Sequence, residues 1–512
     1  MGFDLNTYPA GLKLKNNDKR AIASEIFGNR FHADQTLYEY LIEFLLIFVS
    51  EDNEGENEKA ALSFHNPDAV GNLYYKVQPR MGLKRFIFFD KNKKGDAVTI
   101  DKIAYDELIK VLMGKIYESA GEDEKLEVLE SLQDLLHGYA VVLKKRTWCA
   151  QAMLPLCPEL IFCEAMPAKK KRAAIRWEEV RYDDKEKMKV DTAFDFDKRN
   201  FLARGGELYY LHILQGLSGK PDNKERLEAL LKEQLLERGR KFSKIANFIQ
   251  DAWEEYMGYE EHPTKRLGIS FIPEGAYKNI ALDSVDELIS YLSCRMHPVK
   301  KIELLSKGVM VQIMRMLSVA TTNYLGTERE CWIMDISGIS GNIVKKIAAK
   351  SFADVQGTFT TAIGKNTEAV EAMERLKQIR KARKDSFDIF KSKGKELHCI
   401  IPTSGPYERF SLPEDCIRFL VLALIPPQKK MTLDMFLEKL FEKYRIVIGP
   451  DQYKRVKGFN SINLELANSF NDNVRAFQDF LKATGFLKEL SDATSIVINP
   501  YEELKGAELC NI

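Results

Sequence analysis

Lysines and arginines gather between Arg375 and Lys395, where the sequence RLKQIRKARKDSFDIFKSKGK sets nine cations against Asp385 and Asp388. Helical spacing places four of these cations on one side of a helix, namely Lys377, Arg380, Lys381 and Lys384. Basic side chains on one face neutralise phosphates, so the segment predicts salt-dependent binding to nucleic acid. A solvated helix face of no binding function has the same composition and is the alternative interpretation.

A second basic group, Lys454, Arg455 and Lys457, lies in the C-terminal part of the chain. Residue patterns there predict four helices and then a hairpin made by FLKEL and SIVIN, with the helices over 412–424, 432–444, 450–467 and 471–484. Short helices followed by a β-hairpin outline a winged-helix module, so we expect these cations near a recognition helix. Because such modules also dock proteins, a role in protein–protein contact stays open.

Carboxylates that could hold a catalytic metal occur in the segment FDFDK. Asp195 and Asp197 alternate along an extended stretch and therefore share a face, with Lys198 and Glu207 close behind in the sequence. Such a group could bind a divalent cation and activate water, which makes a divergent metal-dependent nuclease one alternative function. The pattern is common by chance, and a solvated loop is the simpler interpretation.

Two further motifs fall short of known binding loops. The segment from Asp90 to Asp101 aligns with a calcium loop, but Lys94 stands at a ligand position and Asp101 replaces the bidentate glutamate. Its flanks, KRFIFFD and AVTI, predict a β-hairpin instead. The glycines of DISGISGN at 335–342 could approach a phosphate, but no Lys-Ser or Lys-Thr pair follows, so this segment predicts a structural turn.

Cysteines and histidines give no metal-binding pattern. The chain has 8 cysteines without a C-x-x-C pair, and its 7 histidines are scattered without metal-ligand spacing. We therefore predict reduced core cysteines, no bound metal and no cofactor.

The elements that must position these residues are mostly helices. Apolar spacing predicts helices at 35–49 (with Asp34 as N-cap), 102–118, 122–144, across 201–260, 283–294, 299–320, from about 343, and 366–395. Short strands are predicted at 331–336 and 396–402. The predicted class is mostly α with small β elements (α+β) and multidomain. Its predicted parts are an N-terminal α+β domain (1–166), a charged connection (167–200), a helical domain (201–330), a mixed segment with the basic helix (331–409) and a winged-helix-like domain (410–512).

Composition narrows the class of protein. The chain has 512 residues, 45% hydrophobic and 29% charged, which is typical of globular proteins. Its 76 Lys plus Arg against 75 Asp plus Glu give a net charge of +1, which excludes a uniformly basic polyanion binder but allows local basic faces. The most apolar stretch, Leu37 to Val49, is too short to span a bilayer, and Glu39 and Glu43 interrupt it. We expect a cytoplasmic chain without a secretory signal or a membrane partner.

Three segments carry a family resemblance: RFHADQTLYEYLIEFLLIF at 30–48, FLARGGELYYLHIL at 201–214 and the tail from 410. Together they resemble accessory proteins of bacterial antiviral defence islands, found beside helicases and HerA-type ATPases, with Druantia-type systems as an example. The resemblance covers about a third of the chain and carries over no site residue.

The resemblance implies a cytoplasmic, non-enzymatic partner within a DNA-processing complex. The predicted function is a non-catalytic accessory or scaffold subunit of a bacterial antiviral defence complex, which binds other subunits and assists DNA engagement by a partner ATPase or helicase. The alternatives are the divergent nuclease and a pure protein–protein adaptor.

Overall fold

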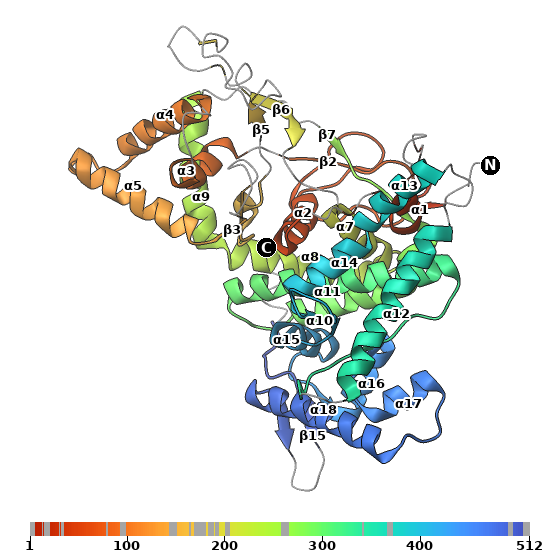
Figure 1. Ribbon diagram of the computed structural model, residues 1–512. Helices are drawn as coiled ribbons and strands as arrows, with labels where there is room; N and C mark the ends of the chain where they lie inside the picture. The colour runs from red at the N-terminus through yellow and green to blue at the C-terminus, as the bar shows by residue number, and fades with distance from the viewer. Residues whose placement is uncertain are drawn as a thin grey trace.

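The computed structural model describes most of the chain between residues 6 and 504. It leaves out 13, 15–20, 30, 32–34, 78–79, 93–98, 143–150, 163–164, 168–180, 183–188, 190–193, 200–204, 258–265, 340–342, 366–371 and 490–494. Helices dominate, and the strands form small sheets of two or three (Figure 1). The predicted mostly α class with small β elements is therefore confirmed.

A long buried helix, α11 (Pro298–Leu325), runs through the middle of the fold. Pro298 starts it at a position where no backbone donor is needed, and Gly326, with a φ of 69°, ends it in the left-handed region. The helices that pack around it are α1 (Ile22–Phe27), α2 (Leu37–Val49), α10 (Glu274–Leu292), α12 (Ile343–Lys365), α14 (Phe387–Glu396) and α15 (Glu414–Leu424).

Helix α2 also packs against α7 (Gly205–Gly216), which is buried along its whole length. The predicted N-cap of α2 was wrong, because Thr36 caps the helix and Asp34 lies outside the described residues. The Thr36 hydroxyl accepts from the Glu39 backbone N–H, and the Glu39 carboxylate accepts from the Thr36 backbone N–H. From α7 the chain continues through α8 (Pro221–Lys232), a π-helical turn (Glu233–Glu237) and α9 (Arg240–Met257).

A helical arm projects from this centre, built by α3 (Met81–Asn92), α4 (Thr99–Lys115), α5 (Glu122–His137) and part of α9 (Figure 1). The hairpin predicted across the first two of these was wrong, since both flanks are helical. Asp101 forms a buried ion pair with Arg85 at 2.6 Å, so the last carboxylate of the calcium-like motif is already engaged.

The basic segment folds as two helices, α13 (Ala372–Lys384) and α14, where a single helix was expected. The break falls at Ser386, whose hydroxyl donates to the Ala382 carbonyl at 2.6 Å and so satisfies the end of α13. Beyond it, Phe387 and Phe390 turn inward and pack against Phe359.

The C-terminal part contains α15, α16 (Leu433–Tyr444), α17 (Pro450–Lys457), α18 (Leu464–Ala483) and a three-stranded antiparallel sheet. In that sheet β15 (Ser495–Ile498) lies between β12 (Lys430–Thr432) and β14 (Leu487–Glu489), so the predicted pairing of the last two strands is confirmed. The predicted helix over 450–467 was too long, because Gly458 ends α17 in the left-handed region and Asn463 caps α18.

The remaining strands are short and join distant segments. A parallel pair links β9 (Trp332–Ile333) to β13 (Ile446–Val447). The antiparallel pairs are β1 (Thr7–Tyr8) with β8 (Ile272–Pro273), β2 (Tyr74–Lys76) with β7 (Arg266–Gly268), β3 (Ala140–Val142) with β4 (Ala152–Met153), β5 (Ala165–Pro167) with β6 (Phe194–Arg199), and β10 (Ile400–Ile401) with β11 (Arg409–Phe410).

One continuous hydrophobic core reaches from Ile22 to Leu504. A smaller core seals the β9–β13 pair against α12, α16, α17 and α18. The five-part division of the chain stays a prediction. Among the described residues, no helix combines the length and apolarity needed to cross a membrane.

Candidate functional site

Helix α13 carries the predicted basic face. Its residues are mostly strong helix formers, and Lys381, Arg383 and Lys384 stand in the last turn, where cations interact favourably with the helix dipole. Ala382 is its buried contact, with Ile379 partly buried beside it, and the helix rests on α1, α12 and α14. The helix is therefore held by one narrow side and presents the other to solvent.

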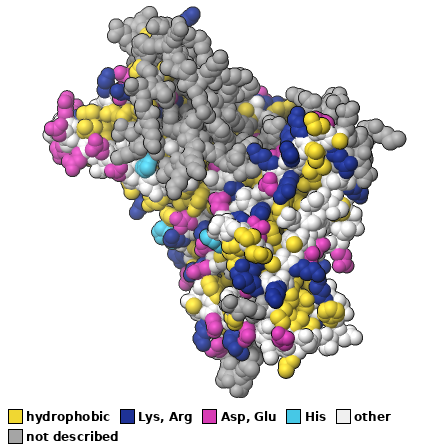
Figure 2. Space-filling model, in the orientation of Figure 1, with side chains coloured by type: hydrophobic (Ala, Val, Ile, Leu, Met, Phe, Trp, Pro, Cys, Tyr) yellow, Lys and Arg dark blue, Asp and Glu magenta, His cyan; other side chains and the backbone are white. Residues whose placement is uncertain are grey.

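The four predicted cations all lie on that outer side. Lys377, Arg380, Lys381 and Lys384 are exposed, and within the described part of the chain none of them has an acidic partner. Their neighbour Arg383 differs, because it pairs with Asp388 at 3.3 Å. Dark-blue side chains lie over α13 and α14 in Figure 2. The structure thus brings the first predicted site together as a positive face that has no acidic partner among the described residues.

Two apolar side chains accompany these cations. Met373 is 85% exposed and Leu376 is 55% exposed on the same helix. Large apolar side chains so open to solvent, set among cations, are typical of a surface that contacts another molecule. This feature was missed from the sequence, although the letters AMERL already place both residues at helical spacing beside the basic run.

The second predicted basic group differs from the first because most of its charges are paired with carboxylates. Lys454, Arg455 and Lys457 lie on the short helix α17, not on the longer helix α18 that follows it. Arg455 donates to both carboxylate oxygens of Glu438, at 2.5 and 2.6 Å, and these hydrogen bonds hold the pKa of Glu438 below its ordinary value. Lys454 pairs with Asp451 at 2.9 Å. Two of the three charges are therefore compensated, and Figure 1 places α17 well away from α13.

The described residues do not show the predicted nuclease residues together in one site. Asp195, Asp197 and Lys198 lie in β6, and their side chains fall outside the described residues. Glu207 is buried in α7, where it accepts a hydrogen bond from the Tyr75 hydroxyl at 3.2 Å. Among the described residues no group of three or more His, Cys, Asp or Glu could hold a metal ion.

Of the glycine-rich turn at 335–342, the structure describes residues 335–339, whose polar groups bond to other groups of the protein. The backbone N–H groups of Ile336 and Ser337 both donate to the side-chain oxygen of Asn473, at 2.8 and 3.1 Å. Asp335 accepts from the Gly338 N–H and pairs with Arg409 at 2.7 Å. Because these donors are already paired, the described part of the turn offers them to no phosphate.

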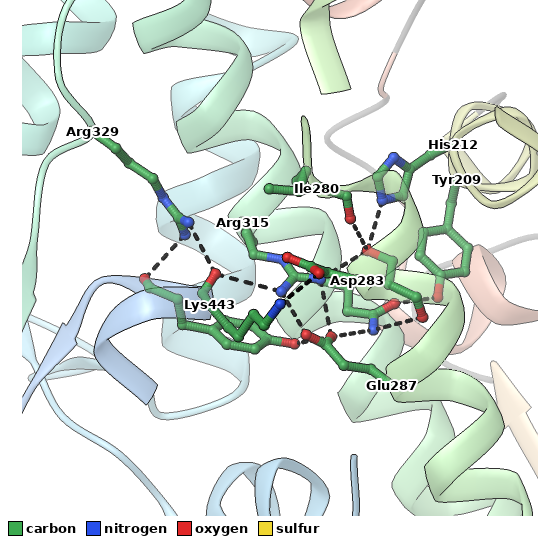
Figure 3. A network of polar contacts seen from close by, with 11 residues as sticks. Tyr209, His212, Ile280, Asp283, Glu287, Arg315, Arg329 and Lys443 are labelled. Carbon is green, nitrogen blue, oxygen red and sulfur yellow. Dashed lines mark hydrogen bonds and ion pairs between the residues drawn. The ribbon is translucent and has the colours of Figure 1, made fainter. Parts of the chain in front are cut away.

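A buried polar network between the central helices was not foreseen (Figure 3). At its centre Arg315 of α11 donates to both carboxylate oxygens of Glu287 of α10, at 2.7 and 2.9 Å. Glu287 also accepts from Gln312 at 2.7 Å and from the Tyr444 hydroxyl of α16 at 2.5 Å. Burial by itself would lower the pKa of Arg315, but the Glu287 carboxylate raises it above the ordinary value, so the guanidinium stays charged.

The network extends to the end of α16, as Figure 3 shows. Arg329 donates to the carbonyls of Lys443 and Tyr444, each at 3.0 Å, and the Lys443 ammonium pairs with Asp283 at 2.7 Å. These contacts satisfy carbonyls that a helix end leaves without partners. The network therefore fastens the C-terminal part of the chain to α10 and α11.

One pair in this network has the outline of a nucleophile and its base, since a ring nitrogen of His212 lies 2.7 Å from the Ser284 hydroxyl. Both side chains are fully buried, and Ser284 already accepts from Arg315 and donates to the Ile280 carbonyl. Burial, aided by the charge of Arg315, lowers the pKa of His212 to about 3. So weak a base, closed off from solvent, fits a structural role.

Comparison with known proteins gives one result. No curated protein and no solved structure matches the chain. Residues 278–500, which run from α10 through β15 and include α13, α17 and most of the buried network, match a protein-family model. That model describes the methylation-associated defense system protein MAD7, and the match supports a component of a defence system.

Proposed function

We propose that this chain is a non-catalytic accessory subunit of an antiviral defence complex, and that the outer face of α13 holds DNA by its phosphates. The observation that carries the proposal is the set of four exposed cations without acidic partners in the described residues: Lys377, Arg380, Lys381 and Lys384. The match to a defence-system family model over the same region supports the setting. The likeness to Druantia-type systems and the identity of a partner ATPase or helicase are further parts of this proposal.

The physical basis is counterion release. A helix face with four cations can neutralise phosphates along a duplex without reading bases, because each neutralised phosphate frees a condensed cation. Such contacts position a duplex and contribute no sequence specificity. This is the task of a subunit that helps a partner enzyme engage DNA, and it needs no catalytic group of its own.

The C-terminal part supports a second role, that of a protein-docking module. Its elements follow in the order α15, β12, α16, β13, α17, α18, β14 and β15. This order and the order of the three-stranded sheet suit the proposed winged-helix module with one additional helix, and β13 pairs with β9 outside that sheet. The charges of α18 nearly balance, with three carboxylates against two cations, and both cations are paired: Arg475 lies 3.5 Å from Asp472, and Lys482 lies 2.8 Å from Glu489 of β14. A charge-balanced surface attracts a polyanion weakly, so this module favours a partner protein over DNA.

Paired alanine variants test the DNA part. We expect K377A/K381A to weaken binding of a fluorescently labelled duplex at low salt by about tenfold or more, because two uncompensated cations are removed. The matched control K454A/R455A also removes two cations, but these are already paired with Asp451 and Glu438, and we expect a change of about twofold or less. Equal losses in the two variants, or no binding by the natural chain at low salt, would overturn the DNA proposal. If the natural chain ignores DNA and still co-purifies with another subunit of its defence system, the adaptor function is the correct one.

A further inference from the structure

Helix α5 is the acidic counterpart of α13. It packs on α3 and α4 through Leu129, Gln133 and Leu136, with Leu132 partly buried beside them, and its opposite side faces solvent. It carries six carboxylates and one lysine, a net charge of −5. Five of those carboxylates have no ion-pair partner in the described part of the chain, namely Glu122, Asp123, Glu124, Glu127 and Glu130.

Exposed apolar side chains lie beside these carboxylates, as they do on α13. Val128 is 43% exposed and Leu135 is 46% exposed, and their spacing of seven residues places them on the same side of the helix. Charge alone would give only a solvated face. The exposed side chains of Val128 and Leu135 give α5 apolar area that a docked partner would bury.

The two helices match in charge and in length. Helix α13 carries six cations and Glu374, a net charge of +5 against the −5 of α5. At 1.5 Å per residue, the 13 residues of α13 and the 16 residues of α5 extend about 20 and about 24 Å. Met373 and Leu376 give α13 an apolar side chain for each of Val128 and Leu135.

Within one molecule these faces cannot meet. Figure 1 places α5 at the tip of the projecting arm and α13 at the opposite side of the molecule, and Figure 2 shows acidic side chains along the arm and basic ones over α13. The charges of the two helices cancel, so the net charge of +1 for the whole chain conceals an acidic end and a basic end. Among the described residues neither face has a complementary partner, and a second copy of the same chain carries both faces.

We propose that the α5 face of one copy docks on the α13 face of another, so that the protein associates head to tail. Two different surfaces meet in such a contact, which makes it heterologous and extendable to further copies. The contact of two single helices lies at the small end of protein interfaces, so it is weak. Because its attraction is between exposed charges, screened over about 10 Å at 0.1 M salt, it weakens as salt rises.

Docking of α5 on α13 also bears on DNA binding, a consequence that rests on the proposed function. Lys377, Arg380, Lys381 and Lys384 are the cations proposed to hold DNA, so α5 of a neighbouring copy and a phosphate backbone compete for one surface. Addition of a DNA duplex separates the copies, and self-association covers the DNA face when DNA is absent.

Sedimentation velocity of the full chain at low salt, over a concentration series, tests the contact. The natural chain associates and dissociates as salt is raised. The variants E124K/E127K, on α5, and K377E/K381E, on α13, each lower the association constant at least tenfold. Variant E56K/E58K is the matched control, because it reverses two exposed carboxylates on a loop and leaves association unchanged.

Mixing the two impaired variants gives the sharpest result. Each retains one natural face, the basic α13 on one variant and the acidic α5 on the other, so an equimolar mixture regains an association that neither variant shows alone. A monomeric natural chain at low salt, or association of E124K/E127K equal to that of the natural chain, overturns the proposal. The variant E124K/E127K keeps the natural α13, so its DNA binding tests the proposed function without the contact between copies. If the natural chain associates but neither it nor E124K/E127K binds DNA, the DNA proposal alone is rejected.

Discussion

The substitution E287Q removes the negative charge at the centre of the buried network and keeps the shape of the side chain. Arg315 would then remain fully buried beside a neutral amide, in contact with the Ser284 hydroxyl, the Lys443 carbonyl and the aromatic ring of Tyr444. Breaking a buried ion pair by the removal of one partner costs about 3–5 kcal/mol, because the other charge is left uncompensated. We expect E287Q to lower the free energy of unfolding by an amount in this range.

The matched variant removes both charges. In E287Q/R315M no buried ion is left, and methionine fills much of the arginine volume, so we expect at least half of the lost stability to return. A double-mutant cycle of E287Q, R315M and the double variant isolates the coupling between the two side chains. The coupling follows from the two short hydrogen bonds between Arg315 and Glu287, at 2.7 and 2.9 Å.

Thermal unfolding measures the effect. At about 2.1 cal/mol/K per residue, 512 residues have an unfolding entropy of about 1.1 kcal/mol/K, so a loss of 3–5 kcal/mol lowers the midpoint by about 3–5 °C. Hydrogen exchange locates it, and faster exchange is expected first in α16, which the network fastens to α10. A midpoint shift of less than 1 °C in E287Q, or a double variant less stable than E287Q, would show that the buried ion pair does not hold α10, α11 and α16 together in this way.

Three further predictions concern buried groups. Burial lowers the pKa of His65 to about 4 and that of His212 to about 3, whereas the unfolded chain binds these protons near pH 6.5. Below pH 6.5 the unfolded state therefore binds more protons than the folded state, so the free energy of unfolding should fall by about 3 kcal/mol for His65 alone by pH 4. Urea unfolding at stepwise lower pH measures this fall, and a free energy of unfolding that stays constant between pH 6.5 and 4 would contradict it. The thiols of Cys399 and Cys416 lie 3.3 Å apart in the core, so diamide should oxidise them slowly to a disulfide and lower the mass by two hydrogens, an outcome absent in C416A. The reaction is slow because the hydrogen bond between the two thiols, together with burial, raises the pKa of Cys416 and keeps the reactive thiolate scarce. A methyl group on Gly308 would lie 2.1 Å from the Phe419 ring, so G308A should lower the free energy of unfolding by about 1–3 kcal/mol. A methyl group on the exposed Gly357 of α12 would meet nothing within 4 Å, so G357A should raise the free energy of unfolding by up to about 1 kcal/mol. Similar melting midpoints for the two variants would contradict the close packing of Gly308 on Phe419.

The basic face could be predicted from the sequence because it depends only on local spacing. Once residues 372–384 are helical, the positions of Lys377, Arg380, Lys381 and Lys384 on one side follow from helix geometry. The cap of α2 was also available, since Thr36 and Glu39 stand at capping-box spacing, and the choice of Asp34 overlooked this signal.

The helices α3 and α4 were mistaken for a hairpin for a physical reason. In FIFF the residues from Phe86 to Phe89 are all buried, so the segment shows no alternation between apolar and polar positions to separate a buried helix from a buried strand. The turn-like letters of KNKKGD then favoured the hairpin.

The buried network could not be read from the sequence at all. Glu287, Arg315 and Tyr444 come from three separate helices and meet only through tertiary packing. The compensation of Arg455 by Glu438 was hidden for the same reason. Sequence spacing therefore located a basic face on α13 correctly, but it could not tell that face from the largely neutralised one on α17.

The salt dependence of duplex binding tests the central claim most directly. Four neutralised phosphates predict a slope of about −3.6 in a plot of log affinity against log salt concentration. The variant K377A/R380A/K381A/K384A should bind weakly with a slope near zero. A natural chain with no measurable affinity at low salt, or a quadruple variant that keeps the natural affinity and slope, would contradict the assignment of α13 as the DNA-binding face.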